Sequence, residues 1–421
     1  MKVLAYTSPA RGHLFPLVGI LDELQRRGHS IALRTLASEV EPMRERGFGV
    51  AAISSRIEAL AHDDYLARNP PGKVKRALAV FTARAEFEVA DLRAAIEAEE
   101  PDALLVDAMS WGASAVADGW AGPWAQWFPY PLPMPSRDVP PFGPGLKPAT
   151  GPLGRLRDRL LAPLILRPVA PAYLSGVNRA RRLAGVSPVA HLADVFTVAP
   201  LLLYMTAEPF EYPRSDWPAS VRMIGPCCWD PPAAPPAWLA DVTCPLVLVS
   251  TSSEFQDDAK LVTTALQALA QEDVQVVATM PATELPRTAV PANARVERFV
   301  AHTPILERAA CAITHGGAGA TQKALAHGVP VCVVPFGRDQ LEVARRAEVA
   351  GAGTRLPAQR LTAKRLRAKV REAIGKREAA RRVADGFARA GGPVSASDAL
   401  EELAAQTNTG SSALSHSAGN A

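Results

Sequence analysis

The residues best placed to do chemistry lie in THGGAGATQKALAHG, residues 314–328. An apolar run leads into His315, a glycine-rich turn and a helical stretch. Such a turn exposes backbone N–H groups at the positive end of the helix, where anions bind. Glycine-rich turns also occur for packing reasons, but His315 adds a side-chain donor for phosphate oxygens. We therefore predict a phosphate site at His315 and the turn Gly317–Thr321, which includes Gly319 and Ala320.

A second apolar run, VPVCVVPF at residues 329–336, is followed by Asp339 and Gln340. The carboxyl ends of parallel strands meet at one edge of a sheet, so this pair is expected on the same edge as His315. Asp accepts hydrogen bonds and Gln both donates and accepts, so the two side chains could hold adjacent hydroxyls of a sugar. The alternative is that Asp339 only caps the following helix.

The N-terminal segment TSPARGHLFP, residues 7–16, has a similar design. A strand is expected at residues 2–7 and a helix from near Pro16, which places His13 in the connecting loop. Asp107 ends another strand, ALLVD, on the same edge of the same sheet. A histidine beside a carboxylate is the arrangement of a general base. No Asp-X-Asp triplet and no cluster with metal-ligand spacing occurs, so we predict no metal.

The elements around these residues alternate between short β-branched runs and amphipathic helical stretches, which predicts parallel sheets. The expected fold class is α/β, with two Rossmann-like, doubly wound parallel-sheet domains that face each other across a cleft. We place an N-terminal domain at 1–211, a proline-rich linker at 212–238 and a C-terminal domain at 239–405, whose last helix could pack back on the first domain. A disordered tail is expected at 406–421, where apolar residues are few.

Composition narrows the function classes. Apolar residues make up 48% of the 421-residue chain and charged residues 21%, which is typical of a soluble globular protein. The net charge of +4 is small, so no nucleic-acid partner is expected. The five cysteines have no ligand spacing, and no signal peptide or stretch of ~20 apolar residues is present. These features predict a cytoplasmic protein.

Three segments together resemble the nucleotide-sugar-dependent glycosyltransferases of plant and bacterial natural-product biosynthesis. They are ARGHLFP (10–16), RVERFVAHTPILERAACAITHGGAG (295–319) and GVPVCVVPFGRDQ (328–340). The resemblance covers most of the chain, with matching order and spacing. It implies the GT-B fold, with a nucleotide-sugar donor held mainly by the C-terminal domain and an acceptor held by the N-terminal one. It also implies an inverting, metal-independent transfer with no cofactor beyond the nucleotide-sugar co-substrate.

The resemblance implies a role for each matching position. His13 is the catalytic base and Asp107 is the carboxylate that orients it. His315 and the turn that follows bind the diphosphate, and Asp339 with Gln340 binds the sugar. Phe299 falls where an aromatic side chain stacks on the nucleobase. His302 and Ser253 align with two further donor-binding positions.

Departures from the family pattern bear on the donor. Ala318-Gly319-Ala320 replaces Trp-Asn-Ser, which removes side-chain contacts to phosphate, and VSTSS replaces the usual Phe-Gly-Ser pattern. Lys323 replaces the glutamate that holds the ribose hydroxyls. The loss of this carboxylate favours a deoxyribose donor, a dTDP-sugar, over a UDP-sugar. Alternatively, Lys323 is a solvated helix residue and the nucleobase pocket decides the donor.

The acceptor side is less distinct in sequence. Residues 128–148 contain eight prolines and read as a long loop. Aromatic residues around it could line an apolar pocket for a hydrophobic small molecule, or could be core; they are Trp111, Trp124, Trp127, Phe128, Tyr130 and Phe142. The basic, apolar segment 153–183 could contact a membrane or form an ordinary helix pair.

Other functions compete with this interpretation. A nucleotide-sugar epimerase of the same fold would not need the histidine–carboxylate pair. A non-catalytic activator of a true transferase would be expected to lose that pair or the HGG turn, and both are present. A nicotinamide dehydrogenase is disfavoured because SPARGH, not GxGxxG, follows the first strand. The sequence leaves a homodimer open as an alternative to a single chain.

Overall fold

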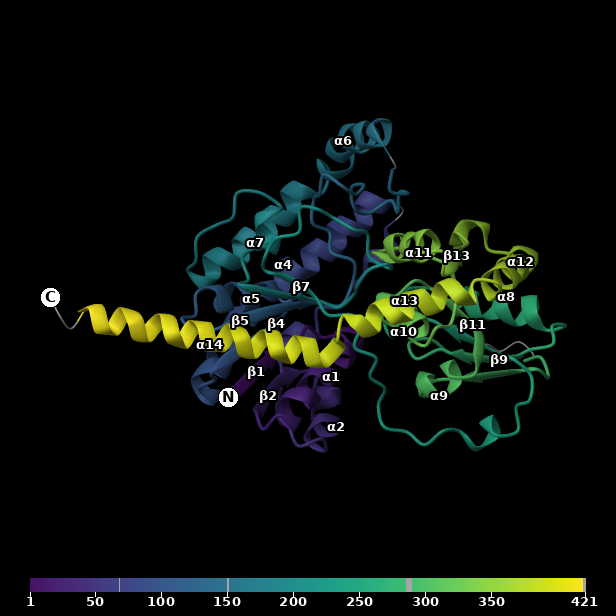
Figure 1. Ribbon diagram of the computed structural model, residues 1–421, viewed down its shortest axis with the longest axis horizontal. Coiled ribbons are helices and arrows are strands. Elements are labelled where there is room, and N and C mark those ends of the chain that lie inside the picture. The colour runs from purple at the N-terminus through teal and green to yellow at the C-terminus, as the bar shows by residue number, and fades with distance from the viewer. Residues whose placement is uncertain (68, 150, 285–289, 419–421) are drawn as a thin grey trace.

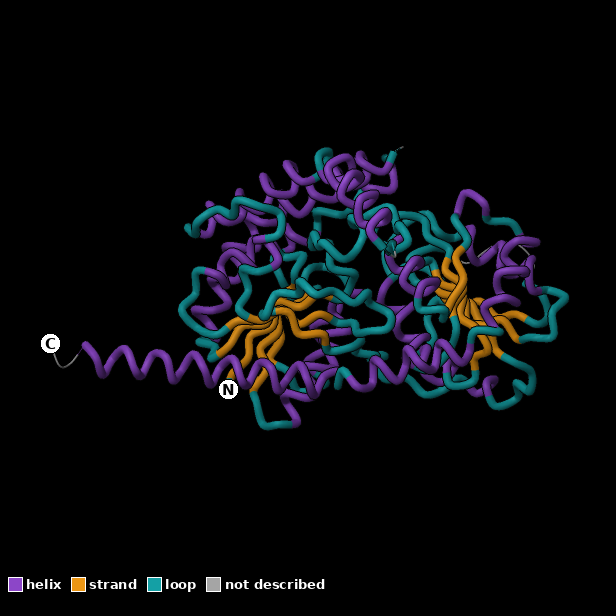
Figure 2. Tube along the Cα trace, turned by 45° about the horizontal axis from the view of Figure 1, so that its top comes forward, coloured by secondary structure: helices purple, strands orange, loops and turns teal. Residues whose placement is uncertain are grey.

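The computed structural model describes residues 1–67, 69–149, 151–284 and 290–418. The chain forms two α/β halves, each with a parallel sheet covered by helices on both faces (Figures 1 and 2). The predicted fold class is therefore confirmed.

The first sheet has seven parallel strands in the order β3-β2-β1-β4-β5-β6-β7. In β1, Val3 and Ala5 pack on one face with α1 (Arg11–Arg26), while Leu4 and Tyr6 pack on the other with α4 (Pro70–Glu99). Burial on both faces explains why these strands read as continuous apolar runs. The strands are β1 (Lys2–Tyr6), β2 (Ser30–Thr35), β3 (Gly49–Ala52), β4 (Ala103–Asp107), β5 (Trp124–Phe128), β6 (Leu201–Tyr204) and β7 (Val221–Met223).

The second sheet has six parallel strands in the order β10-β9-β8-β11-β12-β13. The chain reverses its direction of winding between β1 and β4 in the first sheet and between β8 and β11 in the second. Ligands of doubly wound folds bind beyond the carboxyl ends of the strands at such switch points. The strands are β8 (Leu246–Ser250), β9 (Gln275–Thr279), β10 (Ala294–Glu297), β11 (Ala309–Thr314), β12 (Val331–Val333) and β13 (Gly353–Arg355).

Helices connect these strands and cover both sheets. Helix α1 begins at Arg11, not near Pro16 as predicted, so His13 lies in its first turn. Pro16 lies inside the helix, where its missing N–H removes one intrahelical hydrogen bond and its ring crowds the carbonyl of Gly12. The remaining helices are α2 (Val40–Arg44), α3 (Ser55–Glu58), α5 (Trp111–Asp118), α6 (Pro152–Leu166), α7 (Ala170–Ala184), α8 (Lys260–Leu269), α9 (His302–Leu306), α10 (Ala318–Ala326), α11 (Gln340–Val349), α12 (Ala363–Ile374), α13 (Arg377–Arg389) and α14 (Gly392–Ala418).

The connection between the halves differs from the predicted linker at 212–238. Strand β7 lies within that range and pairs with β6, because Val221 and Met223 continue the apolar pattern of the sheet. The first domain therefore extends at least to Met223, and residues 224–236 form the irregular connection.

Helix α14 returns to the first domain, as the sequence analysis allowed. Ala396, Ala399 and Leu400 join the core formed by Leu14, Leu17 and their neighbours, and Figure 1 shows this yellow helix crossing the first domain. The helix continues to Ala418, where a disordered tail had been predicted from residue 406; residues 419–421 lie outside the described part. No proline interrupts residues 394–418, so every residue of this stretch has a backbone N–H to donate within the helix.

The basic segment forms the predicted helix pair, α6 and α7. Helix α6 buries none of its residues, and its leucines 153, 156, 160 and 164 are all exposed. Within the described ranges, no single helix is long and apolar enough to span a membrane; α6 and α7 reach that length and composition only together, with a 59° bend between them.

Candidate active site

A cavity of about 2080 Å³ lies between the two domains, at the carboxyl ends of both sheets. This volume exceeds that of a pocket for one drug-sized ligand, which is about 300–1,000 Å³, so two substrates have room. Most of the predicted site residues line it: His13, Trp111, Ser253, Phe299, His302, His315, Gly317, Gly319, Ala320, Asp339, Gln340 and Phe142.

His13 and Asp107 form the predicted pair. Nδ1 of His13 lies 2.9 Å and 3.0 Å from the two carboxylate oxygens of Asp107, which is fully buried behind it. Three donors fix that carboxylate: the backbone N–H of Ser8 at 3.0 Å, its hydroxyl at 2.6 Å, and the N–H of Met109 at 2.9 Å. An acceptor at Nδ1 places the proton there and leaves Nε2 as the basic nitrogen.

Electrostatics favour this arrangement. Burial opposes the charge on His13, but the adjacent Asp107 carboxylate outweighs it and raises the pKa of His13 above its usual value. Burial likewise opposes the charge on Asp107. The charge of His13 and the hydrogen bonds from Met109 and Ser8 prevail and lower the pKa of Asp107. The pair can accept a proton at Nε2 and stabilise the resulting imidazolium.

His315 follows β11 and faces the cavity at the start of α10. Its Nδ1 lies 3.3 Å from the carbonyl oxygen of Ser250 at the end of β8. Burial lowers the pKa of His315, although Asp258 opposes the shift. A Cβ on Gly317 would lie 2.5 Å from Nε2 of His315, so glycine is required for the ring to sit against the turn.

The turn itself ends one residue earlier than predicted. The first bond across α10 runs from the N–H of Thr321 to the carbonyl of Gly317, so Ala318, Gly319 and Ala320 have N–H groups without an intrahelical partner. These three residues line the cavity. The assignment of Thr321 to the turn is wrong, because its fully buried hydroxyl pairs with that of Thr314 at 2.9 Å.

The two members of the predicted sugar-binding pair differ in whether other protein groups engage their side chains. Asp339 stands at the N-cap of α11 but makes no capping hydrogen bond, which removes the simple capping alternative. Burial raises the pKa of Asp339 to about 6. The amide of Gln340 is already engaged: its oxygen accepts from the N–H groups of Phe336 and Gly337, and its nitrogen donates to Gln256. Asp339 is thus the member whose side chain is available.

The other donor-side residues follow β8 and β10 and line the same cavity. Phe299 is 52% exposed, so its ring offers an open face. His302 is held by Thr279 Oγ1 at 3.1 Å, and burial lowers its pKa to about 4, so it is neutral. Ser253 faces the other domain, since a Cβ on Gly12 would lie 3.7 Å from its hydroxyl.

Lys323 is neither solvated nor free. It is 7% exposed, and its Nζ forms an ion pair 2.5 Å from Oδ1 of Asp230, in the connection between the domains. The other oxygen of Asp230 accepts from the N–H of Thr303 at 3.0 Å and from its hydroxyl at 2.6 Å. Both carboxylate oxygens of Asp230 are therefore already engaged.

Three of the six predicted acceptor residues do not line the cavity. Trp124, Trp127 and Phe128 belong to β5 and are buried in the cores on the two faces of the sheet. Their assignment to the pocket is wrong, because both faces of a central strand are covered. Trp111, Tyr130 and Phe142 do line it.

Several lining residues were not predicted, because separate elements bring them together. Phe81 and Tyr173 surround Trp111, with ring centroids 5.4 and 5.0 Å away. Tyr130, which was predicted, lies 5.7 Å from the ring of His13. Arg338 bridges the cleft: it pairs with Asp64 of the first domain at 2.9 Å and with Glu254 of the second at 3.0 Å. Among the described residues, no three His, Cys, Asp or Glu side chains gather as a metal site would require.

Comparisons with known proteins identify relatives of this chain. Residues 263–403 match the domain family "Erythromycin biosynthesis protein CIII-like, C-terminal domain". The chain is 33% identical over 422 residues to 4'-demethylrebeccamycin synthase of Lentzea aerocolonigenes, covering 96% of this chain and 99% of that protein. A rhamnosyltransferase of PGL/p-HBAD biosynthesis from Mycobacterium bovis is 33% identical over 217 residues, 51% of this chain and 48% of that protein.

Solved structures share the fold. The glycosyltransferase of kitacinnamycin superposes with a TM-score of 0.72 at 23% identity, covering 96% of this chain and 98% of that one. The glycosyltransferase VinC, in complex with dTDP, superposes with a TM-score of 0.67 at 20% identity, covering 96% and 100%. These structures establish the GT-B architecture, and the full-length relative establishes the family. The chain belongs to the glycosyltransferases of antibiotic and other natural-product biosynthesis.

Proposed function

We propose that the chain transfers a sugar from a dTDP-linked donor to a hydroxyl of a hydrophobic, aromatic small molecule, with inversion at the anomeric carbon. The observation that carries this proposal is the His13–Asp107 pair, which faces a cavity shared with His315 and the α10 turn. A base on one wall and an anion site on the other are what an inverting displacement requires.

The reaction follows from these positions. Nε2 of His13 takes the proton of the acceptor hydroxyl as the oxygen attacks C1 of the sugar from the face opposite the leaving group. The bond from C1 to the phosphate oxygen breaks, and the nucleotide diphosphate leaves with the electron pair. His315 and the N–H groups of Ala318 to Ala320 offset the added charge; one such preorganised donor contributes about 3 kcal/mol.

Two observations support the dTDP donor. No glutamate is available at position 323, and the nearby carboxylate of Asp230 is already engaged by Lys323 and Thr303. A ribose 2′-hydroxyl would therefore find no acceptor there, whereas a deoxyribose needs none. The solved neighbour VinC was crystallised with dTDP.

The acceptor class follows from the cavity wall. Phe81, Trp111, Tyr130, Phe142 and Tyr173 line the side that belongs to the first domain. Aromatic walls of this kind bind flat apolar molecules, whose hydroxyl would point towards His13. The absence of a metal requirement, a cytoplasmic location and a homodimer stay predictions.

Mass spectrometry with dTDP-glucose, UDP-glucose and a panel of aromatic phenols tests the proposal. A product heavier by one hexose, with the β-anomeric coupling in its NMR spectrum, is expected from the α-linked donor. An epimerase would convert the donor without any acceptor, and an activator would do neither. A product with retained α configuration would contradict the inverting mechanism.

A further inference from the structure

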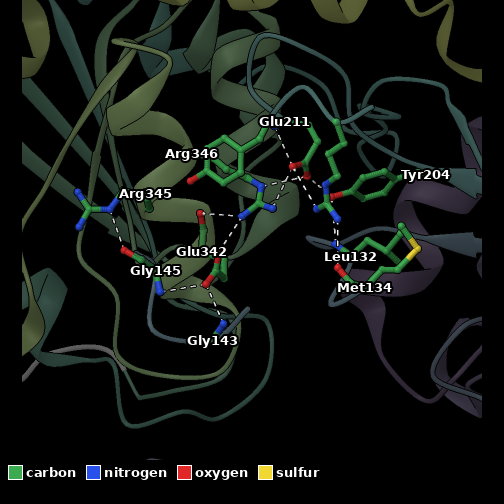
Figure 3. A network of polar contacts seen from close by, with 11 residues as sticks. Leu132, Met134, Gly143, Gly145, Tyr204, Glu211, Glu342, Arg345 and Arg346 are labelled. Carbon is green, nitrogen blue, oxygen red and sulfur yellow. Dashed lines mark hydrogen bonds and ion pairs between the residues drawn. The ribbon is translucent and has the colours of Figure 1, made fainter. Parts of the chain in front are cut away.

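A buried polar network joins the proline-rich loop of residues 129–148 to the helix that begins beside Asp339 (Figure 3). Oε1 of Glu342, in the first turn of α11, accepts the N–H groups of Gly143 at 2.8 Å and Gly145 at 2.9 Å. Arg345 on the same helix donates to the carbonyl of Gly145 at 2.7 Å. The 129–148 loop comes from the first domain and α11 from the second, so these bonds cross between the domains.

The network continues to the start of the same loop. Arg346 donates to Oε2 of Glu342 at 2.9 Å and holds both carboxylate oxygens of Glu211 at 3.0 Å. Glu211 also accepts from the hydroxyl of Tyr204, and that hydroxyl accepts the N–H of Leu132 at 3.0 Å. Figure 3 shows this chain of contacts running from Gly143 to Leu132. One network thus holds both ends of the loop.

Contacts with other segments, such as these, hold the loop in place. It contains no regular helix or strand, and four of the nine residues 140–148 are prolines, which have no N–H to donate. Gly145 approaches α11 so closely that a Cβ would lie 2.4 Å from the carbonyl oxygen of Leu341. Between the two anchors, Phe142 lines the cavity.

The charges in the network are buried and balanced. Glu211, Glu342 and Arg346 are between 1% and 3% exposed, and Arg214 supplies a second cation 3.6 Å from Glu211. Buried ion pairs often add little net stability compared with apolar packing, yet a displaced partner leaves a costly unpaired charge. Such a cluster therefore holds one geometry closely, and here that geometry is the position of the loop against α11.

We propose that Glu342 is a positioning residue that couples the donor and acceptor sites. A donor sugar held at Asp339 fixes the first turn of α11, and the Glu342 carboxylate in that turn fixes the loop that presents Phe142 to the acceptor. The inference rests on the proposed donor and acceptor sites. A rigid element that two sites both contact is the physical basis for such coupling.

Hydrogen exchange of residues 140–148 in the full chain, with and without dTDP-glucose, tests this coupling. In Glu342→Gln the new amide group has only one oxygen, and its NH₂ group must face either the loop N–H groups or Arg346, which are all donors. Exchange without ligand should be about tenfold faster than in the wild type. Saturating dTDP-glucose should slow exchange about threefold in the wild type and leave Glu342→Gln unchanged.

A second variant reaches the same contact without altering any charge. Gly145→Ala should push the loop away from Leu341 and speed exchange to a similar extent, and the double variant should show less than the sum of the two effects, because both break one contact. Glu378→Gln on α13, whose side chain is 91% exposed, is the matched control and should behave as the wild type. If Glu342→Gln does not fold, Gly145→Ala decides the test.

Two results would overturn the proposal. One is a rate of hydrogen exchange at 140–148 that is the same in the wild type and in both variants. The other is equal slowing of exchange by dTDP-glucose in the wild type and in Glu342→Gln, because donor binding would then reach the loop without the Glu342 carboxylate. Calorimetry on the wild type separates this outcome from a wrong donor assignment. Absent binding of dTDP-glucose would refute the proposed donor, and the ligand-free exchange would still decide whether Glu342 anchors the loop.

Discussion

Asparagine in place of Asp107 is the most informative single change near the proposed base. Both carboxylate oxygens of Asp107 lie within 3.0 Å of His13 Nδ1, and both also accept from protein donors: Ser8 donates to one and Met109 to the other. An asparagine NH₂ group placed in either position would face at least one of these donors. The variant therefore cannot satisfy the site in either orientation of its amide.

The magnitude follows from these contacts. A buried donor left without a partner costs about 1–3 kcal/mol, and the imidazolium formed during transfer also loses its counter-charge. A loss of about 2–4 kcal/mol in the transition state corresponds to a kcat about 30- to 1,000-fold lower. The pH dependence should move as well. His13 must be neutral to act as a base, and Asp107 raises its pKa, so removing that charge should shift the acidic limb of the rate profile to lower pH.

Steady-state kinetics from pH 5 to 9, with calorimetry of dTDP, measure both effects. The affinity for dTDP should stay within about threefold of the wild type, since Asp107 lies in the other domain. Asp102→Asn is the matched control, because Asp102 is exposed at the opposite end of β4 and should leave the profile unchanged. A fall in kcat of less than tenfold, or an acidic limb that stays in place, would refute the role given to Asp107.

Three further predictions concern the two substrate sites. His315→Ala should change both kcat and KM for the donor by about tenfold or more, because its partner is the diphosphate before and during transfer; unchanged constants would assign the phosphate to the helix N-terminus alone. Phe142→Ala should raise the KM for the acceptor. Phe128→Ala should lower the free energy of unfolding by about 3–5 kcal/mol in denaturant and leave that KM unchanged. The reverse pattern would contradict the placement of Phe142 in the acceptor pocket and of Phe128 in the core. Lys323→Glu should shift competition between dTDP- and UDP-glucose towards UDP by about 1–3 kcal/mol, and a ratio that ignores the substitution, or a wild-type preference for UDP, would contradict the donor assignment.

The sequence predicted the positions of the candidate site residues wherever they follow a buried strand. His13, Asp107, His315 and Asp339 each come shortly after an apolar run, and parallel strands bring such positions to one edge of a sheet. The start of α1 was misplaced because Pro16 is a favoured first-turn residue, and only the backbone reveals that it lies inside the helix.

Errors arose where long-range contacts decide what a side chain does. Trp127 and Phe128 adjoin the proline-rich loop in sequence, but strand pairing on both sides buries them. Gln340 lines the cavity, but its amide is engaged by Phe336, Gly337 and Gln256. Arg338 and Asp64 are 274 residues apart, so no local pattern could pair them.

The central claim, that His13 is the base of a sugar transfer, is tested most directly by His13→Ala with two readouts on one protein preparation. The expected result is product formation at least about 100-fold below the wild type by mass spectrometry, with dTDP affinity by calorimetry within about threefold. The loss of base with intact nucleotide binding would place the chemistry in the first domain and the donor in the second. Turnover at a tenth of the wild-type rate or more would contradict the account.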